Sequence, residues 1–323
     1  MPTTRIYRST DTSAPVLVGG VSSLIDLIDK CLVVGYGAKT AAGWTKPFTG
    51  TNLAAFRNSV AAGGTGMYLR VDDSGAGTGG ARSARLRAYL TMSGISTGTI
   101  PTPTTAQLSA GVIWRKSNTV DSAARAWILI ADELTMYLCI DAETGVDAGF
   151  GAFAAGDFQS FVPGDPYRFF LAGRETQGGA GDQGAYTGLC LGALAAATPA
   201  SDGFYVARGV AGTGNPLRAN LASLLYNIPI GTASALANPG LGTGLAFWIP
   251  GFIVGEAGIR GRMRGVHVPL SSHAGVAMGA NVVNPPGLAA TTLTTLRHNL
   301  HDSQYDGTFD CHLHVDITNA WPV

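Results

Sequence analysis

Short segments that favour β-strands recur along most of the chain between clusters of glycine and proline, and several of them alternate apolar with polar residues. Short strands at near-regular spacing, separated by turn signals, are typical of an antiparallel sandwich or barrel. Asp132-Glu133 separates the last two segments of the first half, which predicts a β-hairpin there. The segments of the first half are 44–48, 54–58, 67–71, 85–90, 112–116, 126–130 and 135–140.

One segment near the N-terminus has the period of a helix. Its apolar positions are Leu24, Leu27, Ile28 and Cys31. The i, i+3, i+4, i+7 spacing predicts a single amphipathic helix over residues 21–31, with Ser22 or Ser23 as its N-cap. We expect the helix to end at Gly35-Tyr-Gly37, because glycine adopts the left-handed backbone conformation that closes helices.

The second half has a looser pattern. Residues 149–170 interleave phenylalanine with glycine and proline, which predicts a loop-rich stretch whose aromatic side chains close the edge of the core. Residues 176–244 are rich in glycine, alanine and threonine, and we expect some of them to order only in an assembly. Strands return at 245–249, 259–268 and 309–318.

These patterns predict a mainly β protein. An antiparallel β-sandwich-like domain with one short N-terminal helix would occupy residues 1–175. A loop-rich linker region and a second, β-rich domain would occupy residues 176–323.

Composition removes several classes of protein. The 323 residues include 21 basic and 21 acidic side chains, only 13% are charged, and 45 are glycine. Zero formal charge speaks against a disordered tail or a generally basic nucleic-acid binder, so no nucleic-acid partner is expected. No run of 18 apolar residues occurs, and the first residues lack the apolar core of a signal peptide, so we expect neither a membrane span nor secretion by signal peptide.

The low charge also predicts an oligomer. A glycine-rich, charge-poor surface gives a monomer poor solubility at high protein concentration. The same surface is tolerated where it is buried in large contacts between subunits. We therefore expect symmetric self-assembly into a homo-oligomer.

Cysteine and glycine motifs give structural predictions. Cys31, Cys139, Cys190 and Cys311 form no C-x-x-C pair, and several lie in apolar runs. Buried free thiols are therefore favoured over a disulfide or a reactive thiol.

The segment 75–80 matches G-x-G-x-x-G, but a strand pattern follows it where nucleotide binding needs a helix. We predict a loop joining two strands, beside a solvated turn at Asp72-Asp73.

All six histidines lie at or after His267, and the strand pattern places His312 and His314 on one face. This pair could supply two ligands to zinc or iron, with a third from Asp310, Asp316, His298 or His301. Solvent-exposed histidines are the favoured interpretation, and a pH-sensitive contact between subunits is a further one. No metal and no cofactor is therefore assigned.

Enzymatic motifs are missing from the sequence. It contains neither a G-x-S-x-G elbow nor H-E-x-x-H. Carboxylates suited to glycoside cleavage lie in or beside predicted turns, where solvated acids are expected; these are Asp132, Glu133, Asp141, Glu143 and Asp147. We predict a protein that is not an enzyme, and a metal-dependent enzyme using His312 and His314 is the alternative.

Two groups of residues are predicted to contact neighbouring subunits. The aromatic-rich stretch contributes Phe158, Phe161 and Tyr167. A strand over 260–264 would present Arg260, Arg262 and Arg264 on one face, as a solvated or interface stripe.

Several motifs resemble a family of uncharacterised virion structural proteins from tailed bacteriophages and prophages. The longest matches are CLVVGYGAK (31–39), AGWTKPFTGTN (42–52) and MYLRVDDSG (67–75). Shorter ones are WRKS (114–117), AWILIAD (126–132), GDF (156–158), PGD (163–165) and GRMRG (261–265). They cover the first half of the chain well and the remainder in patches.

The resemblance implies a particle component with no catalytic residues to carry over. The expected location is the virion, after assembly in the host cytoplasm with other virion proteins as partners. We expect a place in the tail or its distal apparatus, and a capsid decoration protein is the alternative. A second alternative is a receptor- or carbohydrate-binding tail module, in which exposed Trp44, Trp114 or Trp248 would stack on sugars.

Overall fold

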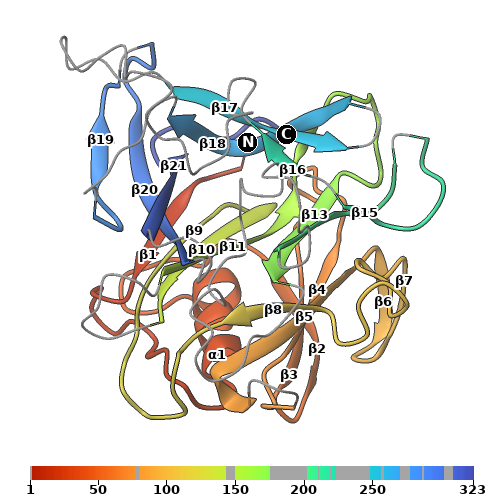
Figure 1. Ribbon diagram of the computed structural model, residues 1–323, viewed down its shortest axis with the longest axis vertical. Helices are drawn as coiled ribbons and strands as arrows, with labels where there is room; N and C mark the ends of the chain where they lie inside the picture. The colour runs from red at the N-terminus through yellow and green to blue at the C-terminus, as the bar shows by residue number, and fades with distance from the viewer. Residues whose placement is uncertain are drawn as a thin grey trace.

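The apolar strands pair into two antiparallel sheets in the computed structural model of the protein (Figure 1). The structure describes residues 2–76, 80–142, 150–174, 202–209, 211–218, 220–222, 248–255, 258–269, 277–285, 287–301 and 308–323. The prediction of a mainly β protein with one short helix is confirmed. Most of the predicted irregular stretch at 176–244 lies outside the described residues.

The first sheet contains all seven strands predicted in the first half. Its strand order is β1 (Arg5–Arg8), β9 (Ala126–Ala131), β10 (Thr135–Asp141), β11 (Phe150–Asp157), β13 (Phe169–Arg174), β8 (Val112–Arg115), β5 (Ser83–Tyr89), β4 (Tyr68–Asp72), β3 (Leu53–Arg57) and β2 (Thr45–Gly50). β14 (Asp202–Val206) and β15 (Leu217–Arg218) extend it from β13. A separate hairpin joins β6 (Thr91–Gly94) and β7 (Thr97–Thr99).

The second sheet is built from the C-terminal part of the chain. Its order is β16 (Asn220–Ala222), β17 (Trp248–Gly255), β18 (Gly258–Pro269), β21 (Thr308–Asp316), β20 (Thr292–His301) and β19 (Asn281–Val283). β12 (Gln159–Ser160) pairs with β18. The sheets therefore do not divide at residue 175: β12 lies before it and joins the second sheet, whereas β14 and β15 lie after it and join the first.

The molecule has three layers, because both faces of the central strands are buried. α1 (Ser23–Asp29) packs on one face of the first sheet and the second sheet covers part of the other (Figure 1). Along β10, Met136, Leu138 and Ile140 face the helix side, and Tyr137 and Cys139 face the second sheet. A strand buried on both faces reads as a continuous apolar run, which is the sequence signal at 135–140.

The predicted hairpin and the predicted free thiols are confirmed where the structure describes them. β9 and β10 pair antiparallel, with Ala131 opposite Met136 across the Asp132-Glu133 turn. Cys31 and Cys139 are buried free thiols. Cys190 and the side chain of Cys311 lie outside the described residues.

The helix begins at a cap that the sequence did not reveal. Ser22, one of the two predicted N-caps, has φ 63° and makes no side-chain capping bond, and Ser23, the other, is the first residue of α1. Instead Asp73, which lies 49 residues away, accepts the Leu24 N–H at 2.9 Å. Burial raises the pKa of Asp73 and lowers that of its partner Lys116, and both side chains are fully buried as an ion pair. The predicted solvated turn is therefore wrong at Asp73.

Glycine ends the helical segment as expected. A π-helical turn, η1 (Lys30–Val34), follows α1, and Gly35 then has φ 87°. A Cβ at Gly35 would lie 2.6 Å from the Lys39 carbonyl oxygen, so no other residue fits this turn without strain.

Two further strand and loop predictions have clear outcomes. The strands on either side of residues 75–80 pair antiparallel, β4 with β5, and a short 3₁₀ turn, η2 (Gly80–Arg82), precedes β5; residues 77–79 lie outside the described part. The loop-rich interpretation of 149–170 is wrong at its start, because residues 150–157 form β11 between β10 and β13.

Lys116→Met tests the buried cap. The substitution leaves the Asp73 carboxylate buried without its cation, so we expect the free energy of unfolding to fall by about 3–5 kcal/mol. Lys46→Met is the matched control, because Lys46 pairs with Asp29 at a partly exposed site and should cost under about 1 kcal/mol. Urea unfolding measures both, and equal losses would contradict the assignment.

Candidate intersubunit surface

Five of the six residues predicted to contact other subunits meet in one place. β12 pairs with the first part of β18, with Gln159 opposite Arg262. This pairing lays the 158–168 segment along β18, and the Phe161 N–H donates to the Arg260 carbonyl at 2.9 Å. We call the surface formed by Phe161, Phe252, Ile259 and Arg262 the β12–β18 surface.

A buried ion pair supports this surface from below. Arg260 Nη2 lies 2.8 Å from Asp165 Oδ2, and both side chains are buried. The Arg260 guanidinium also lies over the Phe158 ring, 5.8 Å from its centroid. Asp165 accepts further bonds from Ser160 Oγ at 2.8 Å and the Tyr167 N–H at 2.9 Å. The loop between β12 and β13 is therefore held in one shape.

Apolar side chains project from this frame. Phe161 is 53% exposed and Ile259 is 43% exposed. The Phe161 ring lies 6.4 Å from that of Phe252, which is partly buried. Arg262 is also partly exposed and donates to Gln159 Oε1. An exposed aromatic and an exposed aliphatic residue on a rigid frame are typical of an anchor for another protein.

The structure corrects three of the six predicted contact residues. Phe158, Arg260 and Arg264 are buried inside the chain, because carboxylates of the same chain pair with both arginines. Tyr167 is partly buried, with the Arg208 guanidinium 5.0 Å from its ring centroid. Phe161 and Arg262 keep the exposure that a contact needs. Phe252 and Ile259 were missed: Phe252 lies beyond the predicted strand 245–249, and Ile259 is the first residue of the predicted strand 259–268.

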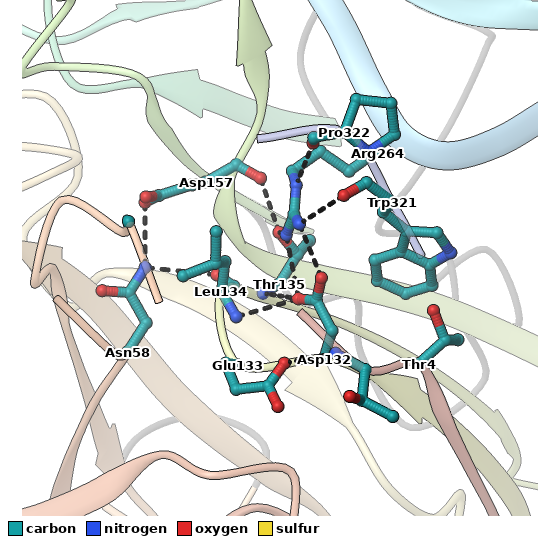
Figure 2. Close-up of polar contacts among 12 residues, drawn as sticks. Thr4, Asn58, Asp132, Glu133, Leu134, Thr135, Asp157, Arg264, Trp321 and Pro322 are labelled. Atoms are coloured by element: carbon teal, nitrogen blue, oxygen red, sulfur yellow. Dashed lines mark hydrogen bonds and ion pairs between the residues drawn. The ribbon is translucent and has the colours of Figure 1, made fainter. Parts of the chain in front are cut away.

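Arg264 instead joins the two sheets, as Figure 2 shows. Its Nη1 donates to Asp132 Oδ1 at 2.9 Å, and its Nη2 donates to Asp132 Oδ2 at 2.6 Å. The other donors reach Thr135 Oγ1 and the carbonyls of Trp321 and Pro322. All five guanidinium N–H groups thus have acceptors, as a buried arginine requires.

The acid of this pair is fixed by the β9–β10 turn. Asp132 Oδ1 accepts the N–H groups of Leu134 and Thr135 at 2.8 and 2.9 Å. Asp132 is fully buried, so the prediction of a solvated acid is wrong there. Glu133 follows the prediction better: it is partly exposed and pairs with Arg5 at 3.1 Å. Glu143 and Asp147 lie outside the described residues.

A second buried carboxylate lies beside this pair. Asp157 Oδ1 accepts Asn58 Nδ2 at 2.9 Å and Thr65 Oγ1 at 2.6 Å, and Oδ2 accepts the Thr65 N–H at 2.6 Å. Arg168 pairs with this carboxylate at longer range, with Nε 4.0 Å from Oδ2. Burial raises the pKa of Asp157 from 3.8 to about 6, against the opposing effect of these hydrogen bonds. Asp157 thus ties the 58–66 loop to β11.

The structure describes the side chain of only one histidine of the predicted metal-binding pair, His314. His314 is buried, contrary to the favoured exposed interpretation, and its Nδ1 lies 3.2 Å from Thr295 Oγ1. Asp316 binds the N–H groups of Thr318 and Asn319 at the end of β21. Among the described residues no group of three metal-ligating side chains occurs. The side chains of His298, His301, Asp310 and His312 lie outside the described part.

The tryptophans proposed to stack on sugars are placed differently. Trp44 and Trp114 are buried in the core between the first sheet and α1. Trp248 is partly exposed, and its ring meets His314 edge-on with centroids 5.9 Å apart. The first two residues are therefore unavailable to a carbohydrate.

No protein-family model and no curated protein matches the chain. Of the helices in the described residues, none has the length and hydrophobicity to cross a membrane.

Asp157 should make stability depend on pH. Its folded pKa of about 6 exceeds the unfolded value. Its contribution to the free energy of unfolding is therefore fully present below about pH 4 and is lost as pH rises through 6. We expect the native chain to lose about 3 kcal/mol relative to Asp157→Asn across this range. Urea unfolding of both proteins between pH 4 and 7.5 measures the difference. The effect of the asparagine itself on the free energy of unfolding does not depend on pH. A difference in this free energy between the two proteins that stays constant with pH would therefore refute the prediction.

Proposed function

We propose that the protein is a non-enzymatic structural subunit of a tailed-phage virion, which acts by symmetric assembly with copies of itself and with other virion proteins. The tail or its distal apparatus is the proposed location. The observation that carries the proposal is the β12–β18 surface, where exposed Phe161 and Ile259 stand on the buried Arg260–Asp165 pair.

The energetics of this surface favour a permanent contact. Burying a large apolar side chain contributes about 1.5–3 kcal/mol, and the Arg260–Asp165 frame already holds the backbone beneath Phe161 in place. Little conformational entropy is then lost when a partner docks. A rigid apolar anchor suits repeated contacts between subunits better than it suits a transient encounter.

The buried charged groups also support a structural role. Asp132, one of the acids considered for catalysis, is occupied on both oxygens by Arg264 and the β9–β10 turn. Asp73 is likewise occupied by Lys116 and the start of α1. These carboxylates stabilise the fold and are not open to a substrate. The burial of Trp44 and Trp114 weakens the carbohydrate-binding alternative.

Copy number separates the tail from the shell. We expect quantitative mass spectrometry of purified particles to find this chain at a few to a few tens of copies per particle. Hundreds of copies would instead assign it to capsid decoration. Failure of the chain to sediment with particles would refute the proposed function.

Phe161→Ser tests the surface itself. Loss of the aromatic anchor should weaken self-association of the full chain about ten- to thirtyfold in analytical ultracentrifugation. Val120→Ser is the matched control, because Val120 is 66% exposed and lies on the loop between β8 and β9. Equal effects of the two substitutions, or none, would argue against this contact.

A further inference from the structure

Four arginines lie together on the face of β3, β4 and β5 that points away from α1. Arg70 and Arg87 are directly opposite each other across β4 and β5, and Arg85 is opposite Asp72. Arg57 lies on the same face of β3, because Arg57 pairs with Tyr68 and alternate residues of a strand share a face. We call Arg57, Arg70, Arg85 and Arg87 the arginine face.

Backbone carbonyls hold three of these guanidinium groups in place. Arg57 Nε donates to the Gly66 carbonyl at 3.2 Å, and Arg70 Nε donates to the Ile95 carbonyl at 3.0 Å. Arg87 Nη2 donates to the carbonyls of Leu108 and Ser109 at 2.5 and 3.1 Å. A carbonyl orients a guanidinium without neutralising its charge, so the positive charge of the face persists.

Among the described residues, Asp72 is the carboxylate that lies beside these four arginines. Asp72 lies 3.5 Å from Arg70 Nη2, and its other oxygen accepts the Ser74 hydroxyl at 2.6 Å. Arg87 is only 8% exposed, its Nε has no acceptor, and no carboxylate among the described residues pairs with it. Burial lowers the pKa of Arg85 in spite of the nearby Asp72. Arg87 is thus a buried cation that no carboxylate among the described residues neutralises, and a bound anion would offset the cost of burying it.

The charge distribution along the chain identifies a source of anions. Residues 45–116 contain eight lysines and arginines but only two acidic residues. This segment therefore carries a net charge of +6, and the rest of the chain carries −6. A second copy of the same chain can supply the complementary carboxylates.

Nucleic acid fits the face less well. Tyr68 and Tyr89 are the aromatic residues that β4 and β5 contribute to this face, and each is only 9% exposed. Phe48 of the neighbouring β2 is partly buried and stacks on Tyr68, with ring centroids 6.1 Å apart. The two tyrosines pack against Met92 and Ile95 of the β6–β7 hairpin, which lies beside β4 and β5 (Figure 1). The two tyrosine rings are therefore closed to the base stacking on which single-strand binders depend, and Tyr68 covers one face of the Phe48 ring.

We propose that the arginine face docks on carboxylates of a second copy of this chain, which makes a head-to-tail contact between two different surfaces. Arginine suits this contact because its planar fork binds a carboxylate through two parallel hydrogen bonds. The inference rests on the proposed self-assembly and adds the chemistry of a second contact to it. Rings or stacked rings follow naturally from such heterologous contacts.

The test measures how self-association of the full chain responds to salt and to substitution of the arginines. Self-association should weaken at least about tenfold between 50 and 500 mM NaCl, because salt screens charge pairs. Arg57→Gln/Arg70→Gln should weaken it about tenfold at low salt and flatten the salt dependence. Arg8→Gln on β1, at the far edge of the same sheet, is the matched control and should change neither.

A measurement on the unsubstituted chain covers the case in which the double variant does not fold. In the associated protein, phenylglyoxal should modify Arg57 and Arg70 more slowly than in the dissociated protein, while Arg8 reacts equally in both. Mass spectrometry reads out each site.

Association that is lost in Phe161→Ser but is insensitive to salt and to the arginine changes would overturn this inference and leave the proposed function standing. A monomeric chain at every salt concentration would overturn it as well, whereas incorporation into particles tests the proposed function separately. Salt-sensitive binding of a duplex DNA oligonucleotide to the arginine face, without self-association, would assign the face to nucleic acid and refute the contact with a second copy.

Discussion

The ion pair between Arg264 and Asp132 is the interaction on which the three-layer arrangement depends. It lies where β18 of the second sheet crosses the β9–β10 turn of the first, and it also holds the backbone at Trp321 and Pro322. Removing one partner from a buried pair leaves a bare charge in the interior, which costs far more than the pair itself contributes. The pair therefore fixes how the second sheet sits on the first, while apolar contacts between the sheets supply most of the attraction.

The sequence predicted the elements whose signals are local. The apolar spacing at Leu24, Leu27 and Ile28 identified the helix, and the apolar runs on either side of Asp132-Glu133 identified the central hairpin. The sequence did not predict β11, where glycine and alanine occupy most positions of the strand because neighbouring segments of the chain pack closely there. A Cβ at Gly156, for example, would lie 2.4 Å from the Leu134 carbonyl oxygen. Small residues lower the strand signal although the close packing of the fold requires them.

The candidate surface was only partly predictable for a related reason. An arginine in a strand is typical of a surface residue, and the sequence around Arg260 and Arg264 does not indicate Asp165 or Asp132 as a counter-charge. The partners Asp165 and Asp132 lie 95 and 132 residues away along the chain. Burial of Asp73 and the cap that it provides for α1 depend on Lys116, which is 43 residues away. Charge pairing across such distances is a property of the fold, so composition and periodicity cannot reveal it.

The double-sided burial of β9 to β11 has a consequence for biosynthesis. When the ribosome has made the first sheet, one of its faces is complete against α1, but Ile130, Tyr137 and Phe170 on the other face still await β18, β20 and β21. A nascent chain at that stage exposes a sheet of apolar residues to solvent. Binding of a chaperone or of another polypeptide to this face would protect the chain from aggregation in this interval, before the last strands emerge.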